Sequence, residues 1–137
     1  MGPRNFREYP VWKESVDYAV HVYQVTNKLP WFEKKGLCDQ LQRAAVSISS
    51  NIAEGAARSS NLDFAHFLHY ALGSAFEVET QLLIAQNVGY INASCYEDLL
   101  QKVHSIERQL NALITAVKSS NPPSPRSDGQ SQGQSQG

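Results

Sequence analysis

Polar side chains that could carry chemistry recur at three- and four-residue steps in two segments of this sequence: Gln40, Arg43, Ser47, Asn51, Glu54, Ser74, Glu77 and Gln81. This spacing places each set on one face of a helix. An arginine among carboxylates, amides and hydroxyls could form a ligand-binding or catalytic pocket. In that interpretation, Glu54 and Glu77 would be paired carboxylates for general acid–base catalysis.

The same polar residues could instead satisfy one another inside the protein, because an apolar stripe runs directly beside each set. A polar stripe in that position is costly unless every group finds a partner. If the two segments form an antiparallel hairpin that turns near residue 58, Arg43 can pair with Glu77, and Ser47 faces Tyr70. The sequence offers no nucleophile with a base and an orienting group, and no glycine-rich phosphate loop. We therefore predict a structural polar network and no catalytic or cofactor-binding residue.

A second candidate for chemistry is the ladder of Asp63, His66 and His69, which could bind a metal ion. These residues point away from the predicted core face of their helix, and no fourth ligand is identifiable. We therefore predict a solvated or interface surface here, and no metal site.

Four helical segments must position these groups, and we place them at about 10–28, 37–54, 62–87 and 95–118. Pro10 suits a first helical turn, and Gly55 is expected to end the second helix. Ser60 with Asp63 and Ser94 with Glu97 resemble capping boxes.

Short connections between amphipathic helices favour an antiparallel up-down-up-down four-helix bundle, an all-α fold, over residues 10–118. Residues 1–9 are predicted to form an N-terminal arm. Residues 119–137 are rich in Ser, Pro, Gly and Gln, so we predict a disordered tail.

The charge balance gives no general attraction to nucleic acid, since 12 Lys and Arg oppose 13 Asp and Glu. Residues 59–101 contain no Lys or Arg, so a surface built from them should repel phosphates. The basic groups that could contact nucleic acid are scattered over the arm, one helix and two loops: Arg4, Arg7, Lys13, Lys28, Lys34, Lys35 and Arg58. The N-terminal residues contain no apolar run that would predict a signal peptide, and no apolar run reaches the ~20 residues that a membrane span needs, so a cytoplasmic location without membrane contact is expected.

Apolar residues in the segment 62–87 extend well beyond one core face, because Leu72, Phe76, Leu83 and Ile84 lie to its side or opposite it. A helix in a lone bundle needs an apolar stripe about 100° wide. The excess would leave exposed apolar patches on a monomer. We therefore predict self-association.

The polar stripe also belongs to a longer motif, formed by Gln40, Arg43-Ala44, Ser47-Ile48 and Asn51-Ile52-Ala53-Glu54-Gly55. A second block follows: Phe64, Phe67-Leu68, Ala71, Gly73-Ser74, Glu77, Thr80-Gln81-Leu82 and Gly89-Tyr90. With these blocks, about residues 6–118 resemble the bacterial four-helix-bundle family, also called the 23S ribosomal RNA intervening-sequence protein family.

The resemblance implies an up-down bundle that assembles as a ring-like homopentamer and has no enzymatic activity. It also suggests a role with RNA, because many members are encoded within intervening sequences of ribosomal RNA genes. A more distant relative is the nucleic-acid-binding accessory protein of diversity-generating retroelements. We therefore expect a cytoplasmic, non-enzymatic homo-oligomer that acts as a scaffold or accessory module. The alternative is an RNA- or DNA-binding accessory protein.

Overall fold

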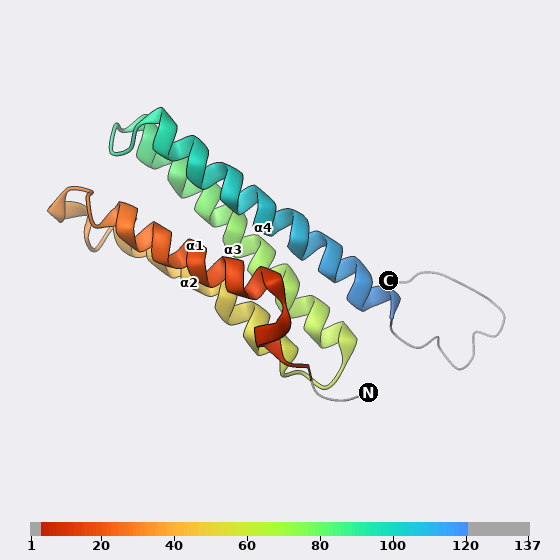
Figure 1. Cartoon of the computed structure of the whole chain (residues 1–137). Coiled ribbons are helices and arrows are strands. Elements are labelled where there is room, and N and C mark those ends of the chain that lie inside the picture. Colours follow the sequence, from red (N-terminus) through yellow and green to blue (C-terminus); the bar gives the residue numbers. More distant parts are fainter. Residues whose placement is uncertain (1–3, 121–137) are drawn as a thin grey trace.

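The structure is a computed structural model that describes residues 4–120 (Figure 1). Its helices are η1 (Phe6–Glu8), α1 (Pro10–Thr26), η2 (Trp31–Glu33), α2 (Leu37–Ala56), α3 (Asn61–Asn87) and α4 (Ala93–Ser119). The long helices run antiparallel in succession, and the described residues contain no β-strand. The predicted all-α four-helix bundle is confirmed. The predicted tail lies outside the described residues from position 121 onward.

The helix ends follow local side-chain chemistry. The Asp63 backbone N–H donates to Ser60 Oγ at 3.0 Å, which confirms the predicted start of α3. The predicted cap at Ser94 is wrong, because Asn92 lies earlier in the chain and its Oδ1 accepts from the Cys95 N–H at 2.8 Å. At the other end of α3, Gly89 adopts φ +88°, a left-handed conformation that favours glycine.

The prediction that Gly55 ends α2 is wrong. Gly55 lies inside the helix, which continues to Ala56. A Cβ atom at this position would lie 2.6 Å from Cβ of Phe67 and 3.0 Å from the ring of Phe64. The missing side chain therefore lets α2 and α3 approach closely beside their connecting turn. Close packing, and not the termination of a helix, explains glycine at this position.

The core runs along the whole bundle and receives side chains from all four long helices. Its largest fully buried side chains include Phe64 and Leu68 of α3, Ile48 of α2 and Leu110 of α4. Among the described helices, none combines the length and the hydrophobicity that crossing a bilayer requires. The packed core holds the polar residues of α2 and α3 in fixed positions at its edge.

Candidate functional site

Three members of the predicted polar network meet between α2 and α3. Ser74 Oγ donates a hydrogen bond to Ser47 Oγ at 2.9 Å. Asn51 Nδ2 donates to the same hydroxyl at 2.9 Å and to the Ser47 carbonyl at 2.8 Å. Because Ser74 is buried, this chain of hydrogen bonds favours one register between the two helices.

The register of the hairpin differs from the expected one, because Ser47 contacts Ser74 and not Tyr70, one helical turn earlier. Tyr70 is exposed. The shift has a geometric cause: side chains on a helix tilt toward its N-terminus. Because α2 runs toward the turn and α3 runs away from it, α2 side chains lean away from the turn and α3 side chains lean toward it. The α3 partner of Ser47 therefore lies further from the turn than equal backbone height would suggest.

The predicted ion pair between Arg43 and Glu77 is wrong within the protomer. Arg43 Nε contacts Asp39 Oδ2 of the same helix at 3.0 Å, and the Arg43 side chain is 78% exposed. Glu77 is also exposed. Both side chains lie at the outer edge of the polar stripe, where water solvates the charges and spares them the penalty of burial.

Glu54 and Glu77 do not form a pair of catalytic carboxylates. Glu54 Oε2 contacts Arg58 Nη2 at 3.2 Å near the end of α2. The neighbouring Gly55 packs on Phe67. Glu77 lies beyond Phe67 along α3, at a distance of about 15 Å at 1.5 Å per residue. The hypothesis of paired carboxylates is therefore wrong.

The remaining polar residues of the stripe border a shallow groove of about 340 Å³ between α2 and α3. The groove is lined by Gln40, Gly73, Phe76, Glu77, Thr80, Gln81 and Ile84. Phe76 and Ile84 are 51% and 47% exposed, although both are large and apolar. Gln81 Oε1 is buried and has no hydrogen-bond partner in the protomer. Apolar side chains within a polar border are typical of a protein interface.

The candidate nucleic-acid contacts separate into two groups. Arg4 packs over the ring of Phe64 at 4.7 Å and donates to the Arg58 carbonyl at 2.6 Å, so it fastens the arm to the turn between α2 and α3. Arg58 in turn lies over the ring of Phe67 at 4.5 Å. These arginines therefore have structural contacts in the protomer.

Of the other basic residues at this end of the bundle, Arg7 stacks on Phe6 at 4.5 Å and Lys13 contacts Asp17 at 3.9 Å. The exposed Lys28, Lys34 and Lys35 lie at the opposite end, around the connection between α1 and α2. The 17 residues of α1 separate the two groups by about 25 Å. These seven residues therefore do not form a single basic patch in one protomer.

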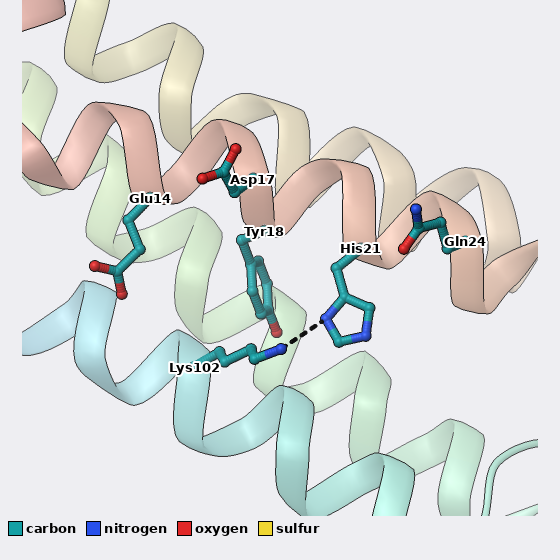
Figure 2. A pocket seen from close by; sticks show the side chains of 6 residues that line it. All are labelled: Glu14, Asp17, Tyr18, His21, Gln24 and Lys102. Carbon is teal, nitrogen blue, oxygen red and sulfur yellow. Dashed lines mark hydrogen bonds between the residues drawn. The ribbon is translucent and has the colours of Figure 1, made fainter.

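A second groove, of about 440 Å³, lies between α1 and α4 and is lined by Glu14, Asp17, Tyr18, His21, Gln24 and Lys102 (Figure 2). Lys102 Nζ lies 3.3 Å from His21 Nδ1. The Tyr18 hydroxyl donates to the Leu99 carbonyl at 2.9 Å, and burial strongly raises the pKa of that hydroxyl. Burial, followed by the charge of Lys102, lowers the pKa of His21. Tyr18 and His21 are engaged in these contacts, and the lining residues do not form an arrangement of nucleophile, base and orienting group.

The ladder on α3 remains a surface feature, because Asp63, His66 and His69 are all exposed. Desolvation, followed by the charge of Lys118, lowers the pKa of His69. The three residues follow one another along the outer side of the first turns of α3. This position agrees with the prediction of a solvated or interface surface.

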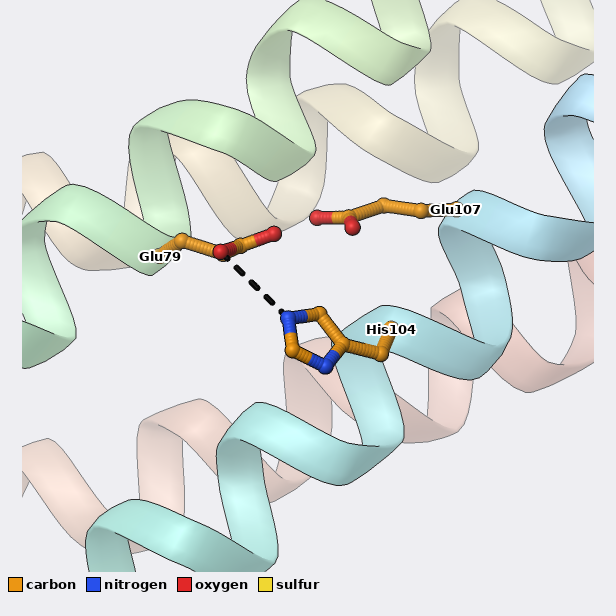
Figure 3. A group of neighbouring side chains, drawn as sticks. All are labelled: Glu79, His104 and Glu107. Atoms are coloured by element: carbon orange, nitrogen blue, oxygen red, sulfur yellow. Dashed lines mark ion pairs between the residues drawn. The ribbon is translucent and has the colours of Figure 1, made fainter.

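Glu79 of α3 meets His104 and Glu107 of α4 in a cluster that was not predicted from the sequence (Figure 3). His104 Nε2 lies 3.4 Å from Glu79 Oε1. Burial, followed by the hydrogen bond that protonated Glu107 donates to Glu79, raises the pKa of Glu107 to about 8. The three-residue spacing of His104 and Glu107 on one helix face was the available sequence signal. Their partner on α3 depends on the packing of the helices.

Fold and surface together define an up-down four-helix bundle whose polar contacts between helices include those of the α2–α3 hairpin, without an assembled catalytic centre among the described residues. Residues 7–112 match the family described as 23S rRNA-intervening sequence protein, and the chain belongs to this family. A similar solved structure is the crystal structure of a protein of unknown function from the S23 ribosomal protein family of Bacteroides thetaiotaomicron VPI-5482. It is 28% identical with a TM-score of 0.72, and the match covers 77% of this chain and 95% of that chain. No curated protein matches this chain.

Proposed function

We propose that the protein is a cytoplasmic, non-enzymatic homo-oligomer, a pentamer in its assembled form, that acts as a scaffold or accessory module. The observation that carries this proposal is the apolar outer side of α3. Phe76, Leu83 and Ile84 are each about half exposed, although the helix already buries a full core face. Covering such side chains contributes about 25 cal/mol per Å² of apolar surface removed from water.

A second copy of the chain fits the groove between α2 and α3 better than a strongly charged partner does. The protein is close to neutral, with a formal net charge of -1, and a net charge near zero favours association between copies. The exposed Arg43 and Glu77 offer both charge signs near the groove, so a copy that carries both can pair with both.

Gly73 gives a further argument for close contact between copies. It lies within α3, where glycine is destabilising by about 0.5–1 kcal/mol relative to alanine. A Cβ atom at this position would meet nothing within 4 Å in the protomer. In the proposed assembly, a neighbouring backbone would pass over Gly73. This close contact would explain glycine at a position where the protomer alone does not require it.

Sedimentation velocity of matched variants tests this surface. Phe76→Glu and Ile84→Glu place a charge in the groove between α2 and α3 and should shift the protein toward smaller species. Val20→Glu is the control, because Val20 is 53% exposed on α1, outside this groove. If all three variants sediment like the wild type, the groove is not an interface between copies.

The alternative is an RNA- or DNA-binding accessory protein, and the family description, which refers to 23S rRNA, supports it. A ring would repeat Lys28, Lys34 and Lys35 in every subunit, and repetition strengthens a weak individual contact. A filter-binding series with ribosomal RNA fragments at increasing salt tests this role. Binding should weaken with salt and with the double substitution of Lys34 and Lys35 by Glu, whereas Lys13→Glu should change it less. Absence of binding at low salt would exclude the alternative.

A further inference from the structure

We propose that Glu79, His104 and Glu107 bind a divalent transition-metal ion between α3 and α4. Each residue offers one ligand atom, and these atoms all lie within 4.8 Å of one another. In Figure 3 the two carboxylates point toward each other from facing helices, and the imidazole of His104 turns toward Glu79. Small rotations of the side chains bring all three atoms to the distance of about 2.0–2.2 Å that a metal ion requires.

The strongest observation is the buried Oε2 atom of Glu107. This residue is only 9% exposed, and its Oε2 is buried without a hydrogen-bond partner. A carboxylate oxygen in such a position is costly unless it is neutralised or paired. The Glu107 carboxylate points into the cluster, toward the carboxylate of Glu79. A bound cation would pair with Glu107 Oε2 and would offset the negative charge of both carboxylates.

The neighbouring groups leave the site available to an ion. Tyr18 of α1 is also buried in this region, but its hydroxyl already donates to the Leu99 carbonyl. Glu79 and His104 are partly exposed, so an ion can enter from solvent. No Lys or Arg forms an ion pair with Glu79 or Glu107 among the described residues.

The donor set indicates the class of metal. One imidazole nitrogen with two carboxylate oxygens suits Zn²⁺, Mn²⁺ or Fe²⁺, whereas Mg²⁺ and Ca²⁺ prefer oxygen ligands alone and Cu⁺ prefers sulfur. Three protein ligands leave coordination positions open for water. Because the ligands come from two helices, the ion would also join α3 to α4 and stabilise the bundle.

Calorimetric titration of the metal-free full chain with Zn²⁺ tests the site, with Mn²⁺ and Mg²⁺ as comparisons. We expect one Zn²⁺ per chain and weaker binding of Mg²⁺. Loss of an outer-shell partner already weakens a metal site by about 10- to 100-fold, so loss of a ligand should cost about 100-fold or more. Glu107→Gln keeps the shape of the side chain, and His104→Ala removes the nitrogen ligand.

His21→Ala is the matched control, because His21 also lies near a carboxylate, Asp98 at 3.8 Å, but outside the cluster. It should leave the affinity unchanged. Circular dichroism of the metal-free variants verifies their folding. If Glu107→Gln and His104→Ala bind Zn²⁺ as the wild type does, or if His21→Ala abolishes binding, the proposal is wrong.

A spectroscopic measurement gives an independent answer. Co²⁺ bound by a nitrogen and two oxygens should produce visible ligand-field absorption in the wild type and in His21→Ala, but not in His104→Ala. Zn²⁺ should raise the melting temperature of the same two proteins only. If the wild type shows neither effect, the cluster is a pair of carboxyl groups that share a proton, and no metal site exists. Neither measurement depends on self-association.

Discussion

Single residues of the α2–α3 hairpin show how a common spacing can lead to different environments. Ser47 and Ser74 have short side chains and share a hydrogen bond between the helices. Arg43 follows the same stripe, but its long side chain reaches solvent and contacts Asp39. The stripe itself could be predicted from periodicity. Its partners could not, because they depend on side-chain length and on the tilt of side chains along each helix.

Gly55 gives the sharpest prediction at this scale. Gly55→Ala should lower the free energy of unfolding by roughly 1–3 kcal/mol, since the added methyl group would overlap Cβ of Phe67. The better helix propensity of alanine offsets only part of this loss. Urea denaturation at a fixed protein concentration measures the change. Ser50→Ala, at an exposed position of the same helix, should stay within about 0.5 kcal/mol of the wild type. Equal stability of Gly55→Ala and the wild type would contradict the close approach of α2 and α3.

At the scale of the helices, hydrophobic periodicity predicted all four long elements, and the structure moved their ends by only a few residues. The errors arose where two local signals competed. Ser94 and Asn92 are both good capping residues, and only the position of the preceding turn decides between them. Gly55 resembled a helix terminator, although Gly89 performs that role in α3.

The start of α4 can be tested by two substitutions two residues apart. Asn92→Ala should destabilise the protein by about 1 kcal/mol, because the Cys95 N–H loses its side-chain acceptor. Ser94→Ala should have little effect, since its hydroxyl does not cap the helix. Thermal unfolding compares the two variants. A larger loss for Ser94→Ala would show that the helix begins later than the structure indicates.

Glu33 joins two connections at one end of the bundle and should make stability depend on pH. Its carboxylate accepts from the Leu37 N–H at 3.1 Å and from the Tyr90 hydroxyl at 2.8 Å. These hydrogen bonds lower the pKa of Glu33 below its usual 4.5. The stabilisation is therefore present above about pH 4.5 and is lost as the pH falls through the lower folded-state pKa.

Urea denaturation between neutral and acidic pH checks this dependence. Glu33→Gln should be less stable than the wild type at neutral pH and should lose less stability in acid. Tyr90→Phe should show an intermediate loss, because the hydrogen bond to Leu37 remains. Asp17→Asn serves as the control, since Asp17 forms only an exposed contact with Lys13. If the free energies of unfolding of Glu33→Gln and the wild type change in parallel with pH, the role of Glu33 in the pH dependence of stability is contradicted.

At the scale of the whole molecule, the bundle encloses one core and leaves the outer side of α3 partly apolar. The four-helix architecture followed from the sequence because local periodicity and short connections determine it. The cluster of Glu79, His104 and Glu107 did not, because it joins residues of two helices whose facing positions only packing determines. The proposed self-association would cover the apolar outer side of α3, and the proposed role as a scaffold or accessory module depends on it.

The mass of the wild-type protein in solution tests this central claim most directly. Light scattering coupled to size-exclusion chromatography, at micromolar concentration and physiological salt, should give a single species of about five times the mass of one chain, as a closed ring requires. The species should persist on dilution through the micromolar range. A mass equal to that of one chain at every concentration would contradict the account.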